Sequence, residues 1–164
     1  MGMFDKLWKR QALPGRYRYV SDGAHWTVLP PISVASFLRA CSIVLPGAML
    51  YIEIQRPVPK ARYVLQEVHT TARRKVQEGT VWPRTEKYHI TVSQDNLRKL
   101  TDIALEMPEG GFADHIVGYT EDRVVLEWYD AGGPIHISES VVESSVVEFA
   151  RLIGSAYEYH AHGE

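Results

Sequence analysis

The chain has 164 residues, 45% of them hydrophobic and 23% charged, which suffices to bury one core but is short for two, so we predict a single globular domain over residues 1–164. Its formal net charge of −2 combines two halves of opposite sign: the first hundred residues carry 16 Lys and Arg against 7 Asp and Glu, and the last sixty-four carry 2 against 13. The single Cys excludes an internal disulfide, and the sequence lacks the run of eighteen apolar residues that would predict a membrane span. We therefore expect a soluble, cytoplasmic protein.

The chain begins with a short amphipathic segment, 1–12, in which Phe4, Leu7 and Trp8 share one side. We expect this segment to pack on the domain as an N-terminal turn, since about ten residues bind a membrane only weakly. It lacks the apolar run of a secretory signal. Two weakly extended stretches, 16–20 and 25–29, follow it.

The first long helix is predicted to start at Pro31 or Ser33, where a proline or a capping side chain opens a helix, and to end at Pro46-Gly47. Its apolar residues recur at helical spacing and include Cys41, which indicates a thiol buried in the core. The run 48–55 then alternates between apolar and polar side chains and is predicted to be a strand with one wet face.

The middle of the chain is predicted to contain a helix over 61–78, a strand over 86–92 and a helix that starts after the N-cap Ser93. Two strands, 115–119 and 123–129, are close enough in sequence to form a hairpin. A brief strand, 135–138, precedes a last helix that we expect to begin with Ser138 as N-cap and Glu139 at its first position. Residues 155–164 are predicted to continue this helix or to fray.

Helices with one narrow apolar stripe, beside strands with one apolar face, are best buried by stacking the helices on one side of a single sheet. The sequence therefore predicts a two-layer α+β domain. Its sheet is expected to have about five to six strands and to be mixed or largely antiparallel.

The sheet face opposite the helices holds the candidate chemistry, because strand alternation places histidines and carboxylates on it. Glu53, His89, Glu127 and His136 are the candidates for divalent-metal binding or acid/base catalysis. Outward strand positions are polar in any half-exposed sheet, however, and no metal-ligand spacing joins the two histidines. We therefore predict no cofactor and favour a protein that is not an enzyme.

Other catalytic or ligand patterns are weaker. His160 and His162 form a His-x-His pair in the tail that suits a metal, although such tracts also bind metal adventitiously. There is no nucleophile elbow and no phosphate-binding glycine loop. The segment 56–87 carries eight cations with interleaved aromatic residues, which makes nucleic-acid binding a second alternative, opposed by the acidic half that follows.

Exposed aromatic side chains and a carboxylate field are typical of a domain that binds a basic protein. The form we favour is a bacterial immunity-type or antitoxin-type inhibitor, and a homodimer is a variant of the same idea. The residues predicted to contact the partner are Tyr51, Asp114, Glu121, Asp122, Glu127, Tyr129 and Asp130.

Overall fold

A computed structural model of the chain describes residues 20–30, 33–44, 49–70, 86–107, 111–129 and 132–162. Its helices are α1 (Val34–Val44), α2 (Pro59–Val68), α3 (Gln94–Leu105) and α4 (Glu143–Ile153), with one turn of 3-10 helix, η1 (Val20–Asp22). Its strands are β1 (His25–Val28), β2 (Tyr51–Pro57), β3 (His69–Thr70), β4 (Lys87–Thr91), β5 (Ala113–Tyr119), β6 (Val124–Tyr129), β7 (Ile135–Ser138) and β8 (Tyr157–His160).

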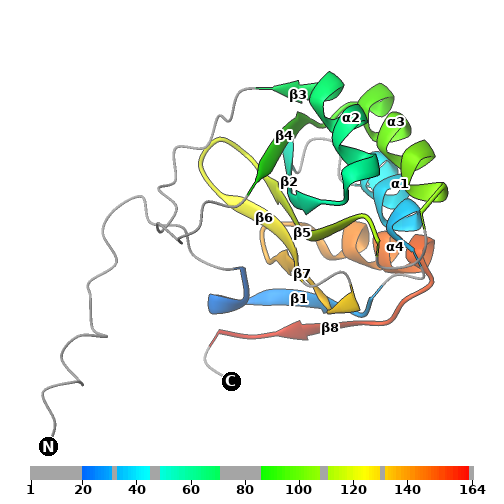
Figure 1. Cartoon of the computed structure of the whole chain (residues 1–164). Coiled ribbons are helices and arrows are strands. Elements are labelled where there is room, and N and C mark those ends of the chain that lie inside the picture. Colours follow the sequence, from blue (N-terminus) through cyan, green and yellow to red (C-terminus); the bar gives the residue numbers. More distant parts are fainter. Residues whose placement is uncertain are drawn as a thin grey trace, which may run out of the picture.

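The strands form one open sheet in the order β3-β4-β2-β5-β6-β7-β1-β8, and every neighbouring pair is antiparallel. Figure 1 shows the helices together on one side of this sheet. Within the helix layer α1 packs against α3 and α4, and α2 packs against α3. The predicted α+β class, with helices on one face, is confirmed.

The core lies between the two layers and is built from the apolar stripes and strand faces that the sequence predicts. Phe37 of α1 packs its ring against Trp128 of β6 and Phe149 of α4, at centroid distances of 4.8 and 6.0 Å. Cys41 is fully buried in this core, as predicted, and burial raises the pKa of its thiol.

Side-chain caps fix two of the helix starts that the sequence predicts. Ser33 Oγ accepts the backbone N–H of Ser36 at the start of α1, and Ser93 Oγ accepts that of Asn96 at the start of α3. The hairpin of β5 and β6 is also confirmed, with a register shift after Gly118.

Three element predictions are wrong in detail. The helix predicted over 61–78 ends at Val68, and His69–Thr70 pairs with β4 as strand β3. The last helix begins at Glu143 rather than beside Ser138, because Ser138 Oγ accepts the N–H of Ser140 and closes a turn instead. Residues after Gly154 neither extend α4 nor fray throughout, since Tyr157–His160 forms β8 against β1.

The strand count is therefore eight among the described residues rather than five to six. Both added strands lie at the edges of the sheet and are short, with two and four residues. Their pairing partners are distant in sequence, so local patterns give little signal for them. The amphipathic segment 1–12 and residues 71–85 lie outside the described residues.

Candidate functional site

All four candidate catalytic residues lie in one row across the sheet face opposite the helices. The register pairs His89 with Glu53, Glu53 with Val117, Val117 with Glu127, and Glu127 with His136. The alternation of the strands thus places these side chains on one face, as the sequence predicts.

The four residues do not converge on one site, because Val117 of β5 separates them into two pairs. Neighbouring strands lie about 4.8 Å apart, so the backbones of Glu53 and Glu127 are about 10 Å apart and those of His89 and His136 about 19 Å apart. Each carboxylate can act with the imidazole beside it, but a single metal ion or substrate atom cannot contact all four. Among the described residues no group of three or more His, Cys, Asp or Glu side chains is arranged to hold a metal ion.

The first pair is centred on Glu53, whose side chain is 0% exposed. Its Oε1 accepts a hydrogen bond from Gln55 Nε2 at 2.6 Å and lies 3.5 Å from Lys87 Nζ. Its Oε2 lies 3.5 Å from Nε2 of His89. A buried carboxylate is stable only when donors and positive charge surround it, and these three side chains supply both.

His89 links Glu53 to a buried tyrosine. Its Nδ1 lies 2.7 Å from the hydroxyl of Tyr119 on β5, while its backbone N–H donates to His69 Nδ1 of β3 at 3.0 Å. Tyr119, His89 and Glu53 thus form a chain of contacts in which the hydroxyl–imidazole step is a hydrogen bond, whereas the imidazole–carboxylate step is a 3.5 Å contact without one. The His89 side chain is only 12% exposed and Tyr119 is 0% exposed, so the chain offers a substrate little access.

The second pair is centred on Glu127, which is also 0% exposed. Its Oε2 accepts the backbone N–H of Val20 at 2.6 Å, and its Oε1 accepts the hydroxyl of Tyr129 at 3.0 Å. The first of these bonds holds η1 against β6 and β7. Glu127 therefore attaches a distant segment of the chain to the sheet, rather than facing a partner as predicted.

Three imidazoles from neighbouring strands lie together beyond Glu127. The ring of His25 (β1) lies 5.1 Å from that of His136 (β7) and is stacked 5.0 Å from that of His160 (β8). His25 Nδ1 donates to Gly23 O at 2.7 Å, and His136 Nδ1 lies 3.4 Å from Thr27 Oγ1. Burial lowers the pKa of His136, and the neighbouring charges of His25 and His160 lower it further.

The His-x-His pair of the tail is divided by the fold. His160 belongs to β8 and to this cluster, whereas His162 lies beyond the strand and is exposed.

The predicted partner-binding residues separate into two groups along the β5–β6 hairpin. Tyr51 stacks on Tyr119 at 5.3 Å, beside the turn that carries Glu121 and Asp122. Asp114 lies at the other end of β5, where Tyr129 pairs with His115. One strand of seven residues, about 20 Å long, separates the two groups. Asp130 lies outside the described residues.

The cations of the basic segment that the structure describes are engaged in ion pairs. These pairs are Arg56–Asp114 at 3.4 Å, Lys60–Glu106 at 2.9 Å, Arg62–Glu86 at 3.0 Å and Lys87–Glu53 at 3.5 Å. The other four cations of the segment, Arg73, Arg74, Lys75 and Arg84, lie outside the described residues. The nucleic-acid alternative stays a prediction, because exposed ion pairs of this kind are weak and half of the eight cations are not described.

Strand β8 carries exposed residues that the sequence prediction assigned to a helix end or a frayed tail. Tyr157 and Tyr159 are 41% and 45% exposed and pack partly on Trp26 of β1, while Glu158 points to the opposite face. The signal for this strand was available as the alternation in Tyr157-Glu158-Tyr159-His160, but four residues beside a glycine are weak evidence for a strand.

Comparison of the chain with models of protein families, with curated proteins and with solved structures found no match. None of the helices in the described ranges is long and apolar enough to cross a membrane. Function is therefore inferred from the site itself.

Proposed function

We propose that the chain is a non-enzymatic protein-binding domain that recognises a basic partner, in the manner of an immunity-type or antitoxin-type inhibitor. One observation carries this proposal: the acidic half has exposed carboxylates that no ion pair between described residues reaches, and these add to a negative field around the molecule. Glu139, Glu143 and Glu158 are exposed, and within the described residues no ion pair reaches them.

The ion pairs described between the basic and the acidic half are Arg56–Asp114 and Lys60–Glu106, and all four of these side chains are at least half exposed. Such pairs are worth little energy and are screened by salt. Mutual neutralisation of the halves is the competing explanation of the charge split. Two exposed pairs account for little of it, which supports a negative field available to a partner.

The contact surface that we propose is the hairpin-end surface, defined by Leu50, Tyr51, Glu121 and Asp122. Leu50 is 45% exposed, and its backbone N–H donates to Tyr119 O, immediately before the hairpin turn. Thr120 Oγ1 donates to Asp122 Oδ1 at 2.6 Å and orders that turn. An apolar and an aromatic side chain flanked by carboxylates is the composition of an interface that attracts cations and then excludes water.

The buried pairs favour binding over catalysis. Glu53 and Glu127 are both fully buried and bonded to neighbouring groups, so neither is presented to a substrate. A general acid or base must come within about 3 Å of the proton that it transfers. Glu139, Glu143 and Glu158, by contrast, are exposed and accessible to a partner.

The test is capture of the partner from extracts of the native host, using the wild-type chain and two charge-reversal variants. Glu121→Lys with Asp122→Lys should reduce capture at low salt by about tenfold or more, since like charges then face the partner. The matched control is Asp102→Lys, an exposed reversal on α3 in the helix layer, which should capture as well as wild type.

Raising the salt to about 1 M should also release the partner, because the Debye length falls to about 3 Å. Capture that persists at about 1 M salt would contradict electrostatic recognition. Capture that Asp102→Lys reduces as much as the Glu121→Lys, Asp122→Lys double variant would refute specific recognition through the hairpin-end surface.

A further inference from the structure

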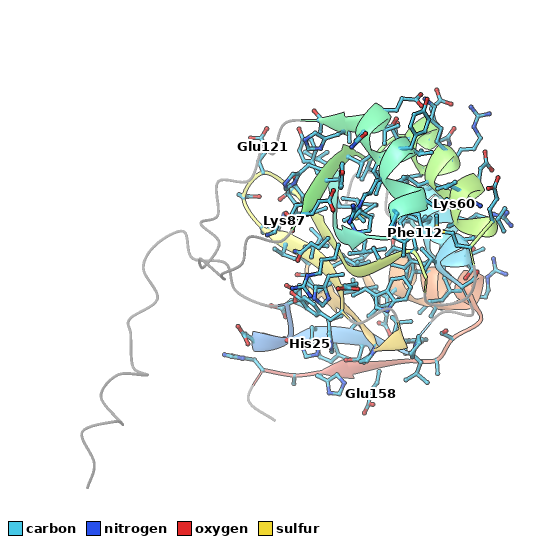
Figure 2. All side chains as sticks on the ribbon, in the orientation of Figure 1. His25, Lys60, Lys87, Phe112, Glu121 and Glu158 are labelled. Atoms are coloured by element: carbon cyan, nitrogen blue, oxygen red, sulfur yellow. The ribbon has the colours of Figure 1, made fainter. Side chains whose placement is uncertain are left out.

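Strand β8 ends the sheet on the side opposite to β3, and no described strand pairs with its outer edge. It pairs with β1 alone in the sheet order, and Tyr157, Glu158 and Tyr159 are all exposed. Figure 2 labels Glu158 on this side of the molecule, far from Glu121 in the hairpin turn. The edge is therefore a second surface, separate from the hairpin-end surface.

The backbone of β8 has hydrogen-bonding groups aimed outward at known positions. Leu29 N donates to Ala156 O at 2.9 Å, which makes this a hydrogen-bonded pair of the β1–β8 ladder. Such pairs alternate along an antiparallel ladder, so the N–H and C=O of Glu158 and His160 face β1. Those of Tyr157 and Tyr159 face away from β1, toward the open edge.

An antiparallel copy of the same strand fits these groups in few registers. A two-fold axis perpendicular to the sheet keeps each side chain on its own face, and residues directly opposite each other must share a face. The two tyrosines, which are odd-numbered, must therefore lie opposite odd-numbered residues of the second copy, and Glu158 must lie opposite an even-numbered one. Four axis positions fall on residues of β8, and an axis at residue 157 would pair the second strand with residues 155 and 156, next to the C-cap Gly154 of α4. The other three positions, at residues 158, 159 and 160, keep the pairing away from the end of that helix.

Charge distinguishes these three positions. An axis at Glu158 places two carboxylates directly opposite each other, and an axis at His160 does the same with two imidazoles. An axis at Tyr159 places Glu158 opposite His160 of the second copy, twice, in non-hydrogen-bonded pairs where side chains are closest. A carboxylate accepts a hydrogen bond from an imidazole N–H whether or not the imidazole carries a charge.

We propose that β8 binds β8 of a second copy of this chain, antiparallel and centred on Tyr159, so that two sheets join into one. The two Tyr159 residues exchange backbone hydrogen bonds, Tyr157 bonds with residue 161 of the second copy, and two Glu158–His160 contacts fix the register. Exposed edge strands are a common template for such pairing.

The dimer is expected to be weak. Strands of four residues bury far less than the roughly 1,200 Å² of a stable interface, so the dissociation constant should be about 0.1 mM or higher. Dimerisation should therefore appear as a rise in average mass with concentration in sedimentation equilibrium, over about 10 μM to 1 mM.

Charge exchange tests the proposed contacts. Glu158→Lys alone removes the carboxylate acceptor from both contacts, and His160→Glu alone places two carboxylates opposite each other in both, so each variant should weaken the dimer about tenfold. The double variant restores opposite charges and should return the dissociation constant to within about threefold of wild type. Asp102→Lys, an exposed reversal on α3 in the helix layer, is the matched control and should leave it unchanged.

Cysteine cross-linking tests the register. The Cα atoms of a hydrogen-bonded pair lie about 5.5 Å apart, within the range that a disulfide spans, so Tyr159→Cys should form a linked dimer under mild oxidation. Tyr157→Cys is the matched control with similar exposure, and its two copies lie about 14 Å apart in this register, so it should not link. The native Cys41 is buried and does not compete.

A chain that stays monomeric across the concentration range would overturn the proposal, and so would equal linking of both cysteine variants. A dimer that neither charge variant weakens would place the interface elsewhere and would also overturn it. Far-UV circular dichroism of each variant checks that the fold is retained, and rescue by the double variant cannot arise from unfolding.

Discussion

The two halves of the open sheet face carry the same pair of groups and use them differently. In the half formed by β2, β4 and β5, Glu53 is surrounded by the side chains of Gln55, Lys87 and His89. In the half formed by β6, β7 and η1, Glu127 accepts the backbone N–H of Val20, which is 107 residues away in the chain. One carboxylate organises neighbouring side chains, and the other attaches a segment.

This difference shows that burial of a carboxylate does not by itself indicate catalysis. Both acids are fully buried in the same row of the same face, so exposure and residue type are identical for the two. The role of each carboxylate depends on its hydrogen-bond donor. The side chains around Glu53 can turn toward water, whereas the backbone N–H bonded to Glu127 cannot. The two halves should therefore respond differently to substitution.

The largest effect is expected from Glu127→Ala. It removes the acceptor of the buried Val20 N–H and of the Tyr129 hydroxyl, and an unsatisfied buried group costs about 1–3 kcal/mol, so the free energy of unfolding should fall by about 3 kcal/mol. Urea denaturation measures this loss. Amide exchange at Val20 should also accelerate strongly, and an unchanged exchange rate would contradict the assigned attachment of η1.

Glu53→Ala should cost less, about 1–2 kcal/mol, because Gln55, Lys87 and His89 can each turn partly toward water. The same denaturation experiment compares the two variants directly. Equal losses for Glu53→Ala and Glu127→Ala would remove the distinction between the two halves.

The paired hydroxyls provide a finer comparison. Tyr119→Phe removes the hydroxyl beside His89, and Tyr129→Phe removes the donor to Glu127, and each should cost about 1 kcal/mol. Double-mutant cycles should couple Tyr129 to Glu127 and Tyr119 to His89, with no coupling between the two sets. Strong coupling of Tyr119 to Glu127 would show that the row acts as one unit.

The smallest effect is a pH dependence in the β6–β7 half. The folded-state pKa of His136 is lowered from 6.5, so the unfolded chain binds more protons as the pH falls. Its contribution to stability is complete above pH 6.5 and is lost as the pH falls through the folded-state pKa. His136→Gln should remove this part of the stability loss, so that the stability of the variant falls less steeply below pH 6.5 than that of wild type.

Urea denaturation across this pH range measures the difference. A His136→Gln profile that runs parallel to that of wild type would contradict the assigned role of burial and of the neighbouring imidazoles.

Much of the candidate site followed from local patterns. Alternation alone placed Glu53, His89, Glu127 and His136 on the face opposite the helices, because side chains on a strand point to opposite sides in turn. The caps Ser33 and Ser93 marked helix starts for the equally local reason that a hydroxyl three residues before a backbone N–H satisfies it.

Other features escaped prediction because they depend on distant partners. The same hydroxyl chemistry misplaced the last helix, since Ser138 Oγ accepts the N–H of Ser140 in a turn and α4 begins only at Glu143. Residues 155–164 have the polar and aromatic character of a tail. Tyr157–His160 becomes a strand only by pairing with β1, which lies far earlier in the chain.

The sequence by itself determined the α+β class, the faces of the helices and strands, and the separation of charge along the chain, because each follows from the spacing of neighbouring residues. Only the tertiary structure decided the strand order, which divides the row of candidate residues into two pairs at Val117 and leaves β8 at an open edge. Strand pairing joins residues far apart in sequence, and its energy depends on contacts that no local pattern encodes.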